Sequence, residues 1–272
     1  MSQNLLGESV DAVVRTIFDD DPGELFVVNP SGETIGELVD VANAYEGEVP
    51  SIRLLGDERT LKDVTDDFLV ASTAATLVED DALELRTVDC NARSSMLVTA
   101  DRTVALVKVG RLVGGITTDD AEFAETAYDA VADDWEDSEP FTLRTPAIDR
   151  VRQTLDAKLG TDVKADFQAI LASMENARGD GDGLDGVTVS LLAAAKNREL
   201  FYDISKWGED VGVASKATFS RTKTKLEDLG LIDTEKVPID IGRPRLRLKL
   251  ADDRLEDAPP AELANAAQSV LS

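Results

Sequence analysis

The stretch of sequence that decides the fold is VASKATFSRTKTKLEDLGLI, residues 213–232. Ser215 is suited to cap the N-terminus of a helix that we expect to end at Leu229, and Gly230 stands where a left-handed residue commonly ends a helix. One side of this helix carries an inner stripe, formed by Phe219, Thr222, Leu226 and Leu229. The pattern predicts a helix with one buried side and one polar side.

The flanking segments turn this helix into part of a larger motif. Two helices are predicted upstream, over 188–197 and 202–211, and Gly212 with Val213 makes the turn before Ser215. Two strands are predicted downstream, over 231–237 and 245–250, joined by a loop through Pro238 and Gly242. Three short helices followed by a two-stranded wing are typical of a winged helix-turn-helix, an α+β fold that binds DNA.

Basic residues are concentrated in this segment. Residues 185–250 hold 12 bases and 10 acids, whereas the whole chain holds 28 bases and 54 acids. On the last strand basic side chains alternate with Pro244, Leu246, Leu248 and Leu250, so one face is expected to be wholly basic. An edge strand protected by charge would show the same alternation. We predict contacts to DNA phosphates and base edges from Ser215, Lys216, Thr218, Ser220, Arg221, Lys223, Thr224, Arg243, Arg245, Arg247 and Lys249.

The N-terminal half alternates short apolar runs with helical stretches, which indicates an α/β domain. Strands are predicted over 25–28, 52–55, 83–88, 96–99, 103–109 and 111–116, and helices over 9–18, 34–44 and 59–78. A further helix over 120–135, capped by Asp119, is expected to face inward with Phe123, Ala127, Val131 and Trp135.

The chain is therefore expected to divide into an effector domain (1–146), linking helices (147–178, with helices over 147–159 and 164–177), a winged helix-turn-helix domain (184–250) and a tail (251–272) with a helix over 260–271. The run GDGDGLDG at 179–186 matches G-x-G-x-x-G, but a helix precedes it and its aspartates would repel a pyrophosphate. It also lacks the glutamate that ends a calcium loop, and we interpret it as a linker.

Composition excludes several classes of function. The chain has no His, so a histidine base or ligand is absent, and its lone Cys90 cannot form an intrachain disulfide or a thiolate cluster. No enzyme motif, cofactor site or metal site is predicted. No stretch is long enough to span a bilayer, so a cytoplasmic protein is expected. The formal charge of −26 indicates adaptation to a salt-saturated cytoplasm, as in a halophilic archaeon.

One stretch of the effector domain departs from this acidity. Residues 91–118 hold four bases and a single acid, Asp101. Cations and hydroxyl groups are what a phosphorylated ligand needs, particularly beside the N-terminus of a helix. A hairpin turn and ordinary surface ion pairs would explain the same residues. We predict a sugar-phosphate site formed by Arg93, Ser94, Ser95, Arg102, Lys108, Arg111, Thr117 and Thr118.

The whole chain resembles the haloarchaeal TbsP-type transcriptional regulators. The resemblance runs from NLLG at 4–7 through SLLAAAKNRELFYDISKWGEDVG at 190–212 to IGRPRL at 241–246. It implies an N-terminal effector domain, a C-terminal winged helix, and control of central sugar metabolism by a phosphorylated glycolytic intermediate, fructose 1,6-bisphosphate being the leading candidate.

The expected partners are a double-stranded DNA operator, a small-molecule effector and a second copy of the chain. One short winged helix reads few bases, and the helices over 147–177 or 260–271 are candidates for pairing across a two-fold axis. Two alternatives remain: a winged helix that binds proteins within a transcription assembly, and a sugar-phosphate enzyme with an appended DNA-binding domain.

Overall fold

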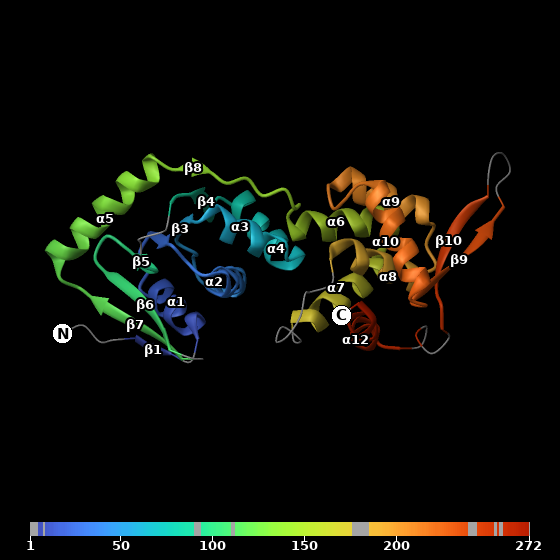
Figure 1. Ribbon diagram of the computed structural model, residues 1–272, viewed down its shortest axis with the longest axis horizontal. Coiled ribbons are helices and arrows are strands. Elements are labelled where there is room, and N and C mark those ends of the chain that lie inside the picture. The colour runs from blue at the N-terminus through green and yellow to red at the C-terminus, as the bar shows by residue number, and fades with distance from the viewer. Residues whose placement is uncertain are drawn as a thin grey trace. The chain divides into compact units, whose positions relative to one another are not determined.

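The computed structural model describes residues 5–7, 9–89, 94–109, 112–175, 185–238, 244–252, 255 and 258–271 (Figure 1). Cys90, Ala177 and most of the 179–186 linker lie outside these residues. The chain divides into two compact units. The N-terminal unit comprises Met1–Asp66 and Thr73–Leu143, and the C-terminal unit comprises Asp67–Ser72 and Arg144–Ser272.

The N-terminal unit is an α/β domain, as predicted. Its elements are β1 (Leu5–Gly7), α1 (Val10–Asp19), β2 (Glu24–Val28), α2 (Gly32–Ala44), β3 (Ser51–Gly56), α3 (Glu58–Thr65), α4 (Phe68–Glu79), β4 (Leu83–Thr87), β5 (Met96–Val98), β6 (Thr103–Val109), β7 (Leu112–Thr118), α5 (Ala121–Glu136) and β8 (Glu139–Pro140). Eight of the described strands form one sheet in the order β1-β7-β6-β5-β2-β3-β4-β8.

The centre of this sheet is parallel and its flanks are antiparallel. β3 pairs in parallel with β2 and β4, whereas β5, β6, β7 and β1 continue the sheet antiparallel on the far side of β2. Residues 25–28 of β2 are all buried, since helices cover both faces of the sheet there. On one face Phe26, Val28 and Val98 pack against Val131 and Trp135 of α5.

Two helix predictions in this unit are wrong in detail. The helix predicted over 59–78 is broken, because Asp66 ends α3 and Asp67 accepts the backbone N–H groups of Leu69 and Val70 to begin α4. α5 is capped by Asp120, which accepts the N–H of Phe123, and not by Asp119. Phe123 was expected to face inward and is 55% exposed.

The C-terminal unit contains the predicted helix-turn-helix and wing. It comprises α6 (Ile148–Leu159), α7 (Thr161–Glu175), α8 (Gly186–Lys196), α9 (Phe201–Val211), α10 (Lys216–Asp228), β9 (Ile232–Val237), β10 (Arg245–Leu250) and α12 (Pro260–Leu271). α8 begins at its cap Asp185, which accepts the N–H of Thr188. β9 and β10 form an antiparallel pair.

All of these helices contribute to one core. Val151 and Leu155 of α6, Phe167 and Ile170 of α7, and Leu263 of α12 are buried together with side chains of α8, α9 and α10. The indole N–H of Trp207 in α9 donates to Thr154 in α6 at 3.1 Å. The helices over 147–177 and 260–271 were candidates for pairing across a two-fold axis, and the apolar side chains named above belong to the core of one chain.

Candidate nucleic-acid interface and ligand pocket

The turn between α9 and α10 is built from glycine and serine. Gly212 is left-handed with φ of 95°, and the Gly208 carbonyl accepts the N–H groups of Gly212 at 3.1 Å and Val213 at 2.8 Å. The Ser215 hydroxyl accepts the N–H of Thr218 at 3.2 Å, which confirms the predicted cap. These local bonds fix the direction in which α10 leaves the turn.

Close packing of α9 against α10 then fixes the separation of the two helices. Phe219 is fully buried, and its ring lies over the backbone of Gly208. A Cβ on Gly208 would lie 2.2 Å from Cε2 of that ring. Only glycine at this position lets the two helices approach as they do.

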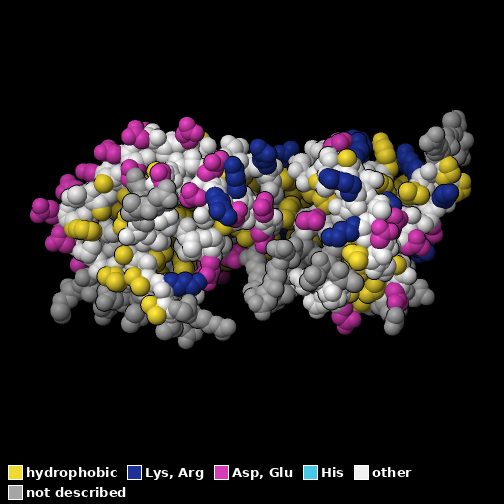
Figure 2. Space-filling model, viewed as in Figure 1, with side chains coloured by type: hydrophobic (Ala, Val, Ile, Leu, Met, Phe, Trp, Pro, Cys, Tyr) yellow, Lys and Arg dark blue, Asp and Glu magenta, His cyan; other side chains and the backbone are white. Residues whose placement is uncertain are grey.

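The outer side of α10 is polar, basic and free of acids in its first three turns. Ala217, Ser220, Arg221, Thr224 and Lys225 are exposed. Within the described part of the chain, neither Arg221 nor Lys225 forms an ion pair. Lys225 was missed by the sequence prediction, although its i+4 spacing from Arg221 was a signal for it. In Figure 2, Lys and Arg side chains show over α9 and α10, whereas Asp and Glu side chains predominate over the N-terminal unit.

The sequence predicted Lys223 on this outer side, but the structure buries its side chain. Its side chain is 11% exposed, and Nζ lies 2.6 Å from Oε2 of Glu227 and 5.8 Å from the centre of the Phe201 ring. Glu227 also accepts the Thr234 hydroxyl of β9. Lys223 points inward because the Glu227 carboxylate and the face of the Phe201 ring both stabilise its ammonium there. Through these contacts it links α10 to α9.

The basic alternation on β10 is present, but the face is not wholly basic. Leu248 and Leu250 are buried, and the bases that alternate with the leucines, Arg245, Arg247 and Lys249, each form an ion pair with an acid. Lys249 Nζ lies 2.9 Å from Asp233, and Arg247 lies 3.5 Å from Glu235, each directly across the strand pair. Arg245 lies 3.8 Å from Asp203 and over the Tyr202 ring. Arg243 lies outside the described residues.

Carboxylates therefore occupy part of the predicted phosphate-binding surface. The Lys249 ammonium holds the pKa of Asp233 below its usual range, and Lys216, 2.7 Å from Glu209, does the same for the pKa of that carboxyl. Both acids stay ionised near neutral pH. A DNA phosphate that binds Lys249 or Lys216 must displace an acid of the protein itself.

Those of the predicted sugar-phosphate residues that the structure describes do not all line one pocket. Arg102 pairs with Asp20 at 2.5 Å, and the Thr118 hydroxyl accepts the N–H of Asp120. Thr117 has a buried hydroxyl that finds no hydrogen-bond partner among the described residues. Ser94 is exposed, while Arg93 and Arg111 lie outside the described residues. Two of the predicted residues, Ser95 and Lys108, line one pocket.

This pocket lies where β2 ends and α2 begins. Its volume is about 350 Å³, and its lining comprises Val10, Asn29, Pro30, Ser31, Glu33, Thr34, Thr60, Ser95, Leu106, Lys108 and Val113. Ser31 caps α2 by accepting the N–H of Thr34, and Asn29 is left-handed with φ of 48°. The Lys108 amine pairs with Glu33. The carboxyl end of a parallel strand beside a helix N-terminus is where α/β domains commonly bind anionic ligands.

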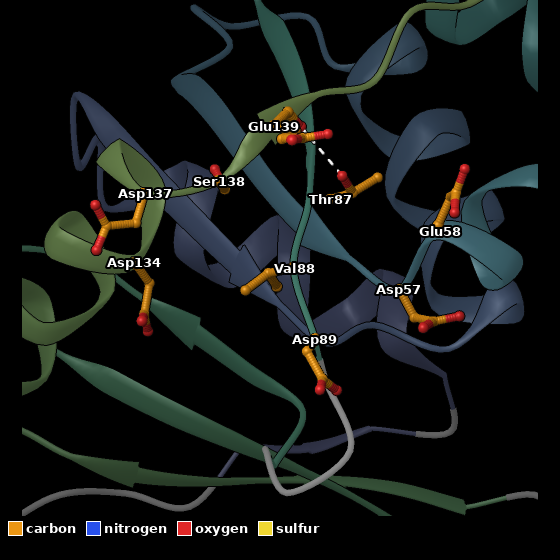
Figure 3. A pocket seen from close by; sticks show the side chains of 9 residues that line it. All are labelled: Asp57, Glu58, Thr87, Val88, Asp89, Asp134, Asp137, Ser138 and Glu139. Carbon is orange, nitrogen blue, oxygen red and sulfur yellow. Dashed lines mark hydrogen bonds between the residues drawn. The ribbon is translucent and has the colours of Figure 1, made fainter.

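A second, larger pocket lies at the carboxyl ends of β3 and β4 (Figure 3). Its volume is about 510 Å³, and the side chains around it include Asp57, Glu58, Asp89, Asp134, Asp137 and Glu139. This density of carboxylates repels a phosphate. The described residues contain no group of three or more acidic or cysteine side chains arranged to hold a metal ion. Nor does any helix among them have the length and apolar content needed to cross a membrane.

Comparisons with known proteins agree with this architecture. Residues 2–146 match the family model described as "Transcriptional regulator TbsP-like, N-terminal", and residues 147–268 match "Transcriptional regulator TbsP-like, C-terminal HTH domain". No curated protein matches the chain. Among the solved structures that match is one titled "Structure of TrmBL2, an archaeal chromatin protein, shows a novel mode of DNA binding". It has a TM-score of 0.33 and 10% identity, and the match covers 52% of this chain and 54% of that one.

Proposed function

The chain belongs to the TbsP-like transcriptional regulators, and we propose that it reads a specific DNA operator under the control of a phosphorylated sugar. The observation that carries the proposal is the outer side of α10. It presents Arg221 and Lys225, which have no carboxylate partner among the described residues, on a helix that follows a glycine turn. A basic, exposed second helix of this motif is suited to the major groove.

Contacts along α10 divide by position. In helix-turn-helix proteins the N-terminal part of the recognition helix contacts base edges. Ser220 and Arg221 lie in that N-terminal part of α10, and an Arg side chain can donate two hydrogen bonds to guanine. Lys225 lies one turn later and is suited to a phosphate. The bases of β10 would add phosphate contacts once Asp233 and Glu235 release them.

The pocket at the N-terminus of α2 is the proposed effector site. Its volume falls in the range of small-molecule sites. A phosphate there would accept hydrogen bonds from first-turn amides of α2 and from Lys108, displacing Glu33. Glu33, Asn29 and the hydroxyls of Thr60 and Ser95 would then face the sugar hydroxyls. We propose fructose 1,6-bisphosphate as the first ligand to test, and central sugar metabolism as the regulated process.

The test has a DNA arm and a ligand arm, both in molar KCl. Selection from a random duplex library should enrich one sequence motif with the wild type and lose it with Arg221→Ala, while Lys62→Ala, an exposed base of α3, keeps it. Calorimetry should show fructose 1,6-bisphosphate binding that Lys108→Ala weakens and Lys62→Ala leaves intact. No enriched motif together with a stable copurifying protein would favour the interaction-module alternative. Turnover of the sugar phosphate would favour the enzyme.

A further inference from the structure

Exposed apolar side chains cluster in one part of the N-terminal unit. Six large hydrophobic residues are exposed among the described ones, and four of them belong to β6, β7 and the first turn of α5. Val107 is 41% exposed, Val109 70%, Ile116 57% and Phe123 55%. Figure 2 shows hydrophobic side chains at the surface where Figure 1 places β6 and β7. Patches of this kind commonly mark interaction sites.

The strand geometry puts three of these side chains on one face of the sheet. Val107 and Val109 alternate with Lys108 along β6, so they lie on the opposite face from the pocket that Lys108 lines. Ala105 faces Ile116 across the strand pair, which places Ile116 on the face of Val107 and Val109. We call the surface of Val107, Val109 and Ile116 the β6–β7 face.

α5 covers the same side of the sheet only in part. Val131 and Trp135 of α5 pack on Phe26 of β2 and Val98 of β5. Phe26 pairs with Val98, Val98 with Thr103 and Ala105 with Met96, so one continuous face runs from beneath α5 to the β6–β7 face. β1 pairs along the outer side of β7 and occupies its backbone edge. A partner therefore meets side chains here rather than a strand edge.

Charge indicates which partner this is. The two longest stretches of the chain without Asp or Glu are residues 102–118, which contain β6 and β7, and residues 211–226, which contain most of α10. The part of α10 without acids, up to Leu226, faces a polyanion in the function proposed above. A chain with net charge −26 is itself a polyanion, and a second copy meets the least like-charge repulsion over strands that carry no acid of their own.

We propose that the β6–β7 face is the homodimer interface, where the same face of a second copy of this chain docks. The dimer would bring two winged helices to two half-sites, and in that respect the inference rests on the proposed function. The buried apolar side chains of α6, α7 and α12, the other candidates for pairing, belong to the core of one chain.

The test is sedimentation equilibrium of the full chain in molar KCl. The wild type should be a dimer at micromolar concentration. Val109→Asp and Ile116→Asp should each raise the dimer dissociation constant at least about tenfold. Val78→Asp is the matched control, because Val78 is a partly exposed valine, 39%, on α4. Circular dichroism of each variant checks that the fold is retained.

Ionic strength gives a second readout. Lowering the KCl concentration lengthens the range of repulsion between two acidic copies, so wild-type dimers should dissociate before the protomer unfolds. A monomeric wild type would overturn the inference, as would a dimer unaffected by both Asp variants or equally weakened by Val78→Asp. A dimer that depends on Val109 but binds no duplex would uphold the inference and overturn the proposed function. Sequence-specific binding by a monomer would overturn the inference and uphold the proposed function.

Discussion

The Phe219 ring of α10 packs so closely on Gly208 of α9 that a Cβ there would lie 2.2 Å from Cε2. Gly208→Ala should destabilise the C-terminal unit by about 1–3 kcal/mol, because overpacking exceeds the gain of about 1 kcal/mol in helix propensity. Gly36→Ala is the control, since nothing lies within 4 Å of its added Cβ, and it should be neutral or stabilising. Urea unfolding followed by Trp207 fluorescence in a Trp135→Phe background measures Gly208→Ala, and Trp135 fluorescence in a Trp207→Phe background measures Gly36→Ala. A Gly208→Ala variant as stable as its parent would contradict the packing argument.

Arg221 and Lys225 should differ in what they contribute to DNA binding. Arg221→Ala should weaken operator binding by about 1–3 kcal/mol and relax the preferred sequence, whereas Lys225→Ala should weaken all duplexes alike. Fluorescence anisotropy on an operator and on a scrambled duplex separates the two effects. Wild-type operator affinity in Arg221→Ala would remove this side of α10 from the DNA.

Lys223 should contribute to stability and not to DNA affinity. Lys223→Ala removes a largely buried partner of Glu227 and leaves that carboxylate without its ammonium, so unfolding should become easier by about 1–3 kcal/mol. Operator affinity of the folded variant should match the wild type. Lower affinity with unchanged stability would show that Lys223 leaves Glu227 to reach DNA.

The acids of β9 should weaken binding to DNA of any sequence. Asp233→Asn and Glu235→Gln release Lys249 and Arg247 for phosphates. Affinity for a scrambled duplex should rise severalfold, and the slope of log K against log salt should steepen by up to about 0.9 for each released base. Anisotropy titrations from low to molar KCl measure this, with Asp63→Asn on α3 as the control. A slope equal to that of the wild type would place the wing away from DNA.

Glu199 should make stability depend on pH in a direction opposite to that of Glu209 and Asp233, whose basic partners lower their pKa values. Burial raises the pKa of this carboxyl above its ordinary value of 4.5, Asp203 raises it further, and Arg247 lowers it. The folded state then holds the proton more tightly than the unfolded state. Its contribution to stability is complete below pH 4.5 and is lost as pH rises through the raised value.

Glu199→Gln should therefore be more stable than the wild type at neutral pH, with the difference shrinking as the carboxyl protonates. Urea midpoints across an acidic to neutral pH series measure this difference. A difference that stays constant with pH would show that burial of Glu199 does not perturb its titration.

The parts of the fold predicted from sequence are those fixed by local chemistry. The Ser215 cap and the Gly212 turn each depend on residues within a few positions of one another. Lys223 was misplaced because a 3.6-residue period leaves it beside the buried stripe, and only the tertiary neighbours Phe201 and Glu227 draw it inward. A lysine was assumed to face water.

Sites made from distant segments could not be predicted in this way. The pocket brings Ser31 of the α2 cap to Lys108 of β6, which requires the strand order of the sheet. The acids opposite Arg247 and Lys249 are present in the sequence, but the register of β9 against β10 is what pairs them. Neither relationship has a signal at short sequence spacing.

The carboxylates on the wing also bear on how quickly a regulator finds its operator. In the function proposed above, every DNA sequence would offer phosphates to Arg247 and Lys249, and each encounter would first have to separate these bases from Glu235 and Asp233. Where no base edges match α10, replacing a carboxylate partner by a phosphate would add little binding free energy, and the complex would dissociate quickly. A short residence time on non-operator sequences shortens the search along a genome. The acids of β9 would therefore lower the affinity for DNA and raise the rate at which the operator is found.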